Sequence, residues 1–172
     1  MKKIFCIAVI VLSFVILCYG QTAADTAKAE IINSKGERIG NATLVETPHG
    51  VLIKVKLTKI PAGIHAFHIH EVGSCEPPSF TSAGGHFNPF GKQHGIMNPK
   101  GLHAGDLPNI HVGSDGRLAF EVLANQVTLA RGQNSLFDKD GSALVVHEKA
   151  DDYKTDPAGE AGSRIACGVV TK

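Results

Sequence analysis

The chain has 172 residues, with 17 Lys or Arg against 16 Asp or Glu, so its formal net charge is +1. This even balance, without any basic stretch, argues against a protein that binds nucleic acid. The length suits a single domain with enough chain to bury a hydrophobic core. No internal repeat and no linker divide the sequence, which also favours one domain.

The first residues have the pattern of a secretory signal peptide. Lys2 and Lys3 give a positive start, residues 4–17 form an apolar run, and small residues follow at positions 22–24. The length of the run is typical of the apolar region of such a peptide. We therefore predict that residues 1–24 are a signal peptide that is removed on export.

The residues also allow two other fates for the N-terminus. The apolar run could be retained as a membrane anchor, although it is short for a span of about 20 residues. Cys18 could carry a lipid and anchor a lipoprotein, although Leu17 is bulky for the position before such a site. We expect a mature domain of residues 25–172, periplasmic or extracellular, without stable membrane insertion after processing and with a lipid anchor as the open alternative.

Short alternating runs separated by turn residues fill the rest of the sequence. Residues 51–57 are the clearest, because Lys54 and Lys56 fall on one face of the expected strand and apolar residues on the other. Short strands with glycine-containing turns, and no long amphipathic helix, predict an all-β sandwich or barrel. Eight strands are expected, at residues 29–32, 42–46, 51–57, 65–71, 109–112, 118–123, 143–147 and 165–171.

Two cysteines, Cys75 and Cys167, lie outside the predicted signal peptide. An even pair in an exported chain is typical of one disulfide, and the alternative is two free, buried thiols. A bridge would tie the long segment of residues 72–108 to the last expected strand. A connection of that length is usually functional or disordered.

Histidine is concentrated between Gly63 and Asp106, a stretch that contains six of the nine histidines. Neutral imidazole is a common ligand for zinc and copper. His68 and His70 lie two apart on an expected strand, so both rings point to one face. Seven candidate ligands, too many for one metal and suited to two sites with one ligand shared or spare, are His68, His70, His86, His94, His103, Asp106 and His147.

Any single histidine of this set could instead be an ordinary polar residue whose hydrogen bonds are satisfied. The same interpretation applies to His49, His65 and His111, which fall outside the pattern. The set as a whole is harder to explain in this way, because three nitrogens and a carboxylate oxygen suit a tetrahedral zinc site.

Several separate motifs together resemble those of the secreted bacterial copper–zinc superoxide dismutases, namely GIHAFHIHE, SAGGHFNP, KQH with LHAGDLP, LVVHEKADD and GSRIACGVV. The resemblance extends from about Ile31 to the C-terminus. It implies an eight-stranded Greek-key β-sandwich or barrel with long metal-binding and electrostatic loops. It also implies an enzyme that converts superoxide into oxygen and hydrogen peroxide.

The resemblance assigns individual residues, with His68, His70, His86 and His147 on copper and His86, His94, His103 and Asp106 on zinc. His86 matches the bridging histidine, whose deprotonated ring touches both metals. Asp151 matches an aspartate that links the ligands His68 and His94 and fixes their orientation. Arg164 matches the arginine that holds the substrate anion beside the copper, so Arg164 and His86 are the expected catalytic residues.

The resemblance also matches Cys75 and Cys167 to the family disulfide. Ala66 stands where the family usually has glycine, which should cost little if its φ is negative. The segment between Cys75 and His86 is shorter than in many relatives, and the chain is expected to be a monomer or a homodimer.

Three alternatives stay beside this interpretation. A protein of the same fold could bind or deliver copper without useful turnover. A zinc-only module would leave three of the histidines without a role. Arg164 could form a surface ion pair with Asp151, Asp152 or Glu160 instead of facing a substrate.

Overall fold

The structure is a computed structural model that describes residues 25–172. The predicted signal peptide, residues 1–24, and the candidate lipid site Cys18 lie outside the described residues. In the part of the chain that is described, no helix combines the length and the apolar character that crossing a membrane requires.

The described residues form an all-β fold, as predicted, with one short 3-10 helix, η1 (Thr81–Ala83). Each of the eight expected strands is present, although the fourth is divided in two. The strands are β1 (Thr26–Asn33), β2 (Arg38–Thr47), β3 (Gly50–Leu57), β4 (Gly63–His65), β5 (Phe67–His70), β6 (Ile110–Val112), β7 (Leu118–Ala124), β8 (Ala143–His147) and β9 (Arg164–Thr171).

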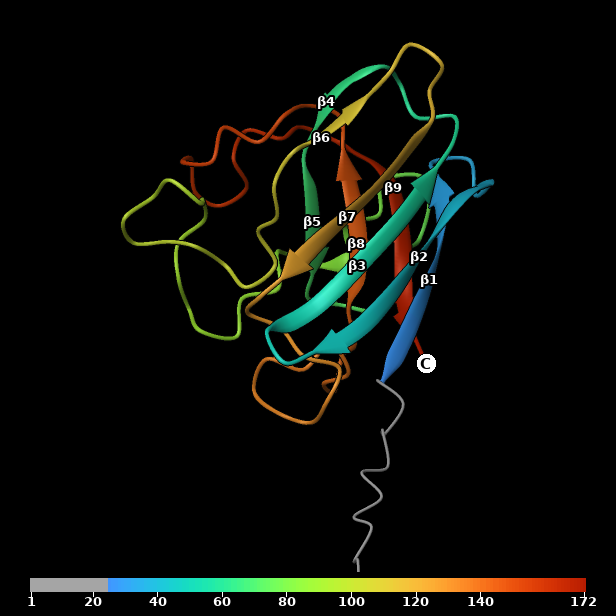
Figure 1. The fold of residues 1–172 in the computed structure, drawn as a ribbon. Helices are drawn as coiled ribbons and strands as arrows, with labels where there is room; N and C mark the ends of the chain where they lie inside the picture. The colour runs from blue at the N-terminus through green and yellow to red at the C-terminus, as the bar shows by residue number, and fades with distance from the viewer. Residues whose placement is uncertain (1–24) are drawn as a thin grey trace, which may run out of the picture.

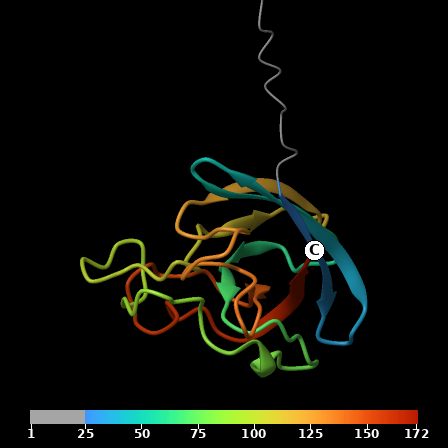
Figure 2. The ribbon, with the colours of Figure 1, turned by 90° about the horizontal axis from the view of Figure 1, so that it is seen from below.

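Seven strands form one antiparallel sheet in the order β5-β8-β9-β1-β2-β3-β7, and β4 pairs with β6 in a second, two-stranded sheet. Figures 1 and 2 show that the large sheet curls around a central core. The neighbours β9 and β1, β3 and β7, and β5 and β8 are not consecutive in the chain, which gives the long crossing connections of a Greek-key arrangement.

The core follows from the alternation of side chains along the strands. On β3, Val51, Ile53, Val55 and Leu57 are buried while Lys54 and Lys56 are exposed, as the sequence predicts. The interior is closed by side chains from other strands, among them Leu44, Phe67 and Leu144. Burial of each large apolar side chain contributes about 1.5–3 kcal/mol to the free energy of folding.

The expected strand of residues 65–71 divides at Ala66. The Ala66 amide donates to Lys149 O at 2.8 Å, and Ala66 O accepts from the amide of His147 at 2.9 Å. These bonds take the chain from the pairing of β4 with β6 to that of β5 with β8. Ala66 is not among the residues with positive φ, so a side chain is tolerated where the family usually has glycine.

Two long segments, residues 72–109 and 148–163, lie beside each other on one side of the barrel (Figures 1 and 2). The His94 amide donates to Asp156 Oδ1 at 2.6 Å, and the Met97 amide donates to Tyr153 O at 2.9 Å. The functional segment predicted from the sequence is therefore held against a second loop that comes from a distant part of the chain.

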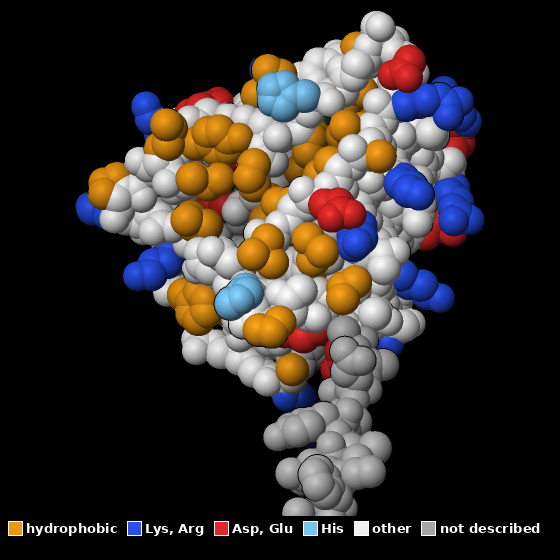
Figure 3. Space-filling view, in the orientation of Figure 1, with side chains coloured by type: hydrophobic (Ala, Val, Ile, Leu, Met, Phe, Trp, Pro, Cys, Tyr) orange, Lys and Arg blue, Asp and Glu red, His pale blue; other side chains and the backbone are white. Residues whose placement is uncertain are grey.

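Apolar side chains are spread over the part of the surface in Figure 3 that carries β4, β6 and β7. Ile64 on β4 and Leu123 on β7 are 48% and 45% exposed. Exposed apolar patches are commonly used for association between proteins. The expectation of a monomer or a homodimer stays a prediction.

The predicted disulfide is present between Cys75 and Cys167, with the two Cα atoms 5.7 Å apart. The bond joins the long segment after β5 to β9, across a sequence separation of 92 residues. Crosslinks that close long loops restrict the unfolded chain most strongly.

Removal of this crosslink should therefore destabilise the protein. The double variant Cys75→Ala with Cys167→Ala should lower the free energy of unfolding by about 4–5 kcal/mol, the value that chain entropy gives for a loop of this size. Urea denaturation of the metal-free protein, with the wild type under non-reducing conditions as the reference, measures this difference. Coincident unfolding curves would show that the bond does not stabilise the fold.

Candidate metal centre

Three of the candidate ligands stand on two paired strands. His68 and His70 lie two residues apart on β5, so their side chains leave the same face. His147 ends β8, the antiparallel partner of β5. His70 Nε2 and His147 Nε2 are 3.3 Å apart, and all three residues are buried. The sheet therefore holds three imidazoles around one point.

The segment after β5 folds back along the outer edge of that strand. The Phe87 amide donates to Ile69 O at 2.8 Å, and the Ile69 amide donates to Gly105 O at 2.9 Å. A Cβ atom on Gly105 would lie 2.3 Å from Ile69 O, so only glycine permits this approach. The backbone bridges place His86 and Asp106 directly beside β5.

A first group of four nitrogens is formed by His68, His70, His86 and His147, with the ligand atoms within 4.8 Å of one another. His68 Nδ1 and His86 Nε2 are buried and have no hydrogen-bond partner among the described residues. Burial lowers the pKa of His86 to about 4 and that of His147 to about 3. Both rings are thus neutral at pH 7, and a group of four imidazole nitrogens fits copper.

A second group surrounds the carboxylate of Asp106. Its Oδ1 atom lies 2.8 Å from His86 Nδ1, 3.0 Å from His94 Nδ1 and 3.3 Å from His103 Nδ1. Its Oδ2 atom accepts from the amides of Gly95 and His103. Three nitrogens and one carboxylate oxygen, all buried, are a donor set that suits tetrahedral zinc.

His86 belongs to both groups. Its Nδ1 atom faces Asp106, while its Nε2 atom lies with the nitrogens of the first group. The rings of His86 and His68 have centroids 4.0 Å apart. One imidazole thus presents its two nitrogens to two different sets of ligands.

Asp151 lies between the two groups. Its Oδ2 atom is 2.9 Å from His68 Nε2, and its Oδ1 atom is 3.0 Å from His94 Nε2. These contacts engage the two Nε2 atoms, so His68 Nδ1 is the nitrogen left for the first group and His94 Nδ1, beside Asp106, is the nitrogen left for the second. Such partners fix the tautomer and the orientation of a ligand.

The two carboxylates set the charge of His94. Burial lowers the pKa of His94, but hydrogen bonds to Asp106 and Asp151 outweigh this effect and raise it to about 9. Burial likewise acts to raise the pKa of each carboxylate, but hydrogen bonds from the histidines hold both pKa values well below the usual range.

Asn109 is a supporting residue that the sequence analysis does not single out. Its side-chain amide donates to Asp151 O at 2.9 Å, and its Oδ1 atom accepts from the Asp151 amide at 2.8 Å. The Asn109 amide itself donates to the hydroxyl of Tyr153. These contacts join residues far apart in the chain, and no local motif signals them.

Arg164 lines a pocket of about 500 Å³ together with candidate ligands, including His70, His86 and His147. Its guanidinium donates to Phe80 O and Gly84 O, both at 2.6 Å. No ion pair of Arg164 with an acidic side chain occurs within residues 25–172. The alternative of a surface ion pair is therefore wrong, because backbone carbonyls hold this side chain at the pocket.

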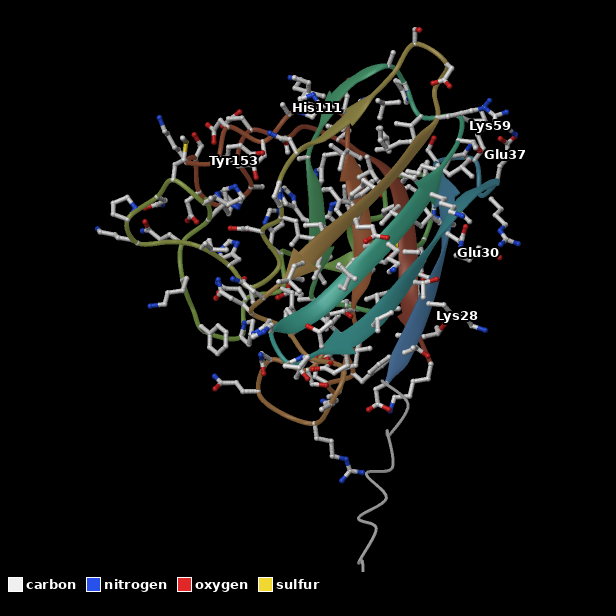
Figure 4. The ribbon with its side chains drawn as sticks, in the orientation of Figure 1. Lys28, Glu30, Glu37, Lys59, His111 and Tyr153 are labelled. Carbon is white, nitrogen blue, oxygen red and sulfur yellow. A yellow bond between two sulfur atoms is a disulfide. The ribbon has the colours of Figure 1, made fainter. Side chains whose placement is uncertain are left out.

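The remaining histidines lie apart from the ligand groups. His65 is buried, with Nδ1 2.9 Å from His147 O and Nε2 2.9 Å from Pro61 O, so it supports the strand that carries His147. His49 and His111 are exposed, and Figure 4 shows His111 near the outer surface on β6. The interpretation of all three as ordinary polar residues agrees with these positions.

The family model described as Copper/zinc superoxide dismutase matches residues 38–170. The chain belongs to the copper/zinc superoxide dismutase family. Superoxide dismutation, with copper and zinc as cofactors, was predicted from the sequence and is the activity for which this family is named. The family assignment agrees with the two donor groups, which fit those two metals.

Individual members of the copper/zinc superoxide dismutase family are closely similar to this chain in sequence or structure. Superoxide dismutase [Cu-Zn] 1 of Aquifex aeolicus is 58% identical over 83% of this chain and 85% of the relative. The copper–zinc superoxide dismutase of Caulobacter vibrioides is 44% identical over 84% of this chain and 85% of that enzyme. A crystal structure of a superoxide dismutase-like protein from Bacillus subtilis matches with a TM-score of 0.81 and 41% identity, over 84% of this chain and 97% of that one.

If His94 binds zinc, its raised pKa should make zinc binding depend on pH. In the metal-free protein this ring carries a proton below about pH 9, and the proton must leave before Nδ1 can bind a metal. Zinc binding at pH 7 should release about one proton, and the apparent affinity should rise about tenfold per pH unit up to about pH 9. Calorimetric titration in buffers of different ionisation enthalpy measures the released proton.

The variant Asp151→Asn is the matched control for this measurement. It keeps a side chain of the same shape but removes one of the two negative charges beside His94. On zinc binding, this variant should release a smaller fraction of a proton than the wild type releases. Equal heats in all buffers for the wild type would contradict the charge assigned to His94.

Proposed function

We propose that this chain dismutates superoxide at a copper held by His68, His70, His86 and His147, beside a zinc held by His86, His94, His103 and Asp106. The shared ring of His86 carries the proposal. Its Nδ1 atom lies in the carboxylate-containing group, and its buried Nε2 atom, which has no hydrogen-bond partner among the described residues, lies in the group of four imidazoles. A donor set of mixed type next to a set of nitrogens alone is the arrangement that two different metals require.

The metals and the protein contribute different parts of the reaction. Bound copper supplies the one-electron chemistry, in which one superoxide is oxidised to oxygen and a second is reduced to hydrogen peroxide. The protein supplies neutral rings, a pocket of about 500 Å³ and a fixed cation at its wall. Because His86 lines this pocket, its Nε2 atom would be placed to carry a proton to the reduced substrate whenever that nitrogen is not bound to copper.

Arg164 is the residue we propose to bind the substrate anion. The guanidinium has five N–H donors, and two of its nitrogens are fixed by the carbonyls of Phe80 and Gly84. The remaining donors are available in the pocket. An arginine held in this way meets a small anion without losing further freedom of its own side chain.

The alternative of a copper-binding or copper-delivery protein without turnover is not favoured. A protein from Bacillus subtilis that is 42% identical is named superoxide dismutase-like, and we base the case for activity on the site of this chain and not on its fold. In this chain four nitrogen donors form one group, and three of them, His70, His86 and His147, line a pocket with Arg164. A zinc-only module would leave the group of His68, His70 and His147 unused.

We also propose that the mature protein consists of residues 25–172 and acts outside the cytoplasm, in the periplasm or beyond the cell. The charge and apolar pattern of residues 1–24 supports export. The bond between Cys75 and Cys167 supports it independently, since disulfides persist in oxidising compartments. Attachment to a membrane through a lipid on Cys18 is the alternative, and mass spectrometry of the mature N-terminus separates the two.

The metal assignment predicts about one copper and one zinc per chain, with selective losses in variants. His103→Ala or Asp106→Ala should lose zinc first, and His147→Ala should lose copper first. Elemental analysis after full loading, with a dismutase assay on the same samples, tests both parts. Detection of one metal in total, or equal loss of both metals from every variant, would overturn the assignment. His111→Ala, at an exposed position, serves as the control.

The role of Arg164 predicts a graded series of rates. Arg164→Lys keeps the positive charge but loses the forked guanidinium donors, so its dismutation rate should be modestly below that of the wild type. The rate of Arg164→Ala should be lower still. The rate of Arg164→Glu should be the lowest, because its negative charge repels superoxide. Copper and zinc contents should stay normal. The wild-type rate should drop as salt rises, since screening acts within about 10 Å at 0.1 M. Wild-type activity in Arg164→Glu at low salt, with both metals bound, would contradict this role.

A further inference from the structure

Glu71 is a carboxylate in the pocket whose role is not covered by the metal groups. It follows β5 directly and lines the pocket together with Arg164 and His86. Its Oε1 atom accepts from the Gly85 amide at 2.8 Å, while its own amide donates to Gly85 O at 3.0 Å. The side chain and the backbone of Glu71 therefore hold Gly85 from two sides.

The segment held by Glu71 controls two functional side chains. Gly85 immediately precedes His86, and Gly84 O accepts from both Arg164 Nη2 and His70 Nδ1. The side chain of Glu71 also lies against Gly84, since a Cβ atom there would be 2.8 Å from Glu71 Cγ. The backbone position of these two glycines thus sets where the shared ring and the arginine stand.

The negative charge of Glu71 opposes substrate binding, although its hydrogen bonds support the residues of the pocket. The carboxylate forms no ion pair with another side chain in residues 25–172. Burial lowers the pKa of Arg164 and the field of Glu71 raises it, so the two charges act on each other within the pocket. A negative charge at the wall of a pocket repels an approaching anion.

We propose that Glu71 is a positioning residue for His86 and Arg164 through its hydrogen bond to Gly85, and that its negative charge slows the arrival of superoxide. Only the effect of the charge on superoxide rests on the proposed function; the positioning role does not. A hydrogen bond that a carboxylate accepts is stronger than one that a neutral oxygen accepts, which explains why an acidic residue holds this position in spite of its charge.

Two substitutions separate the hydrogen bond from the charge. Glu71→Gln keeps a side-chain oxygen at the position of Oε1 but removes the charge. Glu71→Ala removes both. Glu30→Gln is the matched control for loss of one negative charge. Glu30 on β1 pairs with Arg38 on β2 at an exposed surface, on the side of the barrel away from the long loops (Figure 4).

Amide hydrogen exchange tests the positioning role in the metal-free protein. Glu71→Ala should speed exchange of the Gly85 amide about fivefold, as expected for loss of one hydrogen bond, whereas Glu71→Gln should stay within about twofold of the wild type. Unchanged exchange in Glu71→Ala would overturn the positioning role. This measurement needs neither metal nor activity, so it is independent of the proposed function.

Rates across a salt series, measured on protein loaded with copper and zinc, test the charge. At low ionic strength Glu71→Gln should exceed the wild-type rate by about two- to threefold, and the difference should vanish at high salt. Glu30→Gln should match the wild type at every salt concentration. A Glu71→Gln rate equal to or below the wild type at low salt would overturn the second part of the proposal.

The copper spectrum separates the two effects in the loaded protein. Glu71→Ala should change the electron paramagnetic resonance signal of bound copper, because His86 shifts, and Glu71→Gln should restore the wild-type signal. A changed signal in both variants would show that the charge, and not the hydrogen bond, positions the ligands. A wild-type protein that binds both metals without dismutase activity would instead refute the proposed function and leave the exchange result standing.

Discussion

The burial of two carboxylates among six imidazoles is the constraint on which the rest of this structure depends. Unpaired, such groups would destabilise the fold strongly. Here Asp106 accepts from three rings and two backbone amides, and Asp151 joins His68 to His94. These contacts require that a long segment run along β5 and that a second loop close over it. The barrel holds the long segment and the second loop in fixed positions relative to each other.

The strands and most of the site could be predicted because they leave local patterns. Alternation along β3 and the two-residue spacing of His68 and His70 follow directly from the geometry of a strand. The division at Ala66 leaves no such pattern, since it arises from hydrogen bonds to Lys149 and His147. The same is true of Asn109 and of the carbonyls that hold Arg164, where distant segments meet only after folding.

The resemblance and the physical interpretation contribute different kinds of support. Membership of the family comes from a match over residues 38–170, whereas the case for activity comes from a few atoms at one pocket. The superoxide dismutase-like protein of Bacillus subtilis shares the fold at a TM-score of 0.81, which shows how far the scaffold can be conserved under a different name. In this chain the pocket carries candidate donors, an arginine held by backbone carbonyls and a carboxylate that accepts from the Gly85 amide.

The ring of His86, which serves both groups, has a thermodynamic consequence. Under the proposed assignment, a metal bound on one side of this ring would fix its orientation for the metal on the other side, so occupation of the two sites would be coupled. By linkage, the factor by which zinc strengthens copper binding equals the factor by which copper strengthens zinc binding. Where both ions are scarce, molecules with two ions or with none should therefore outnumber those with one.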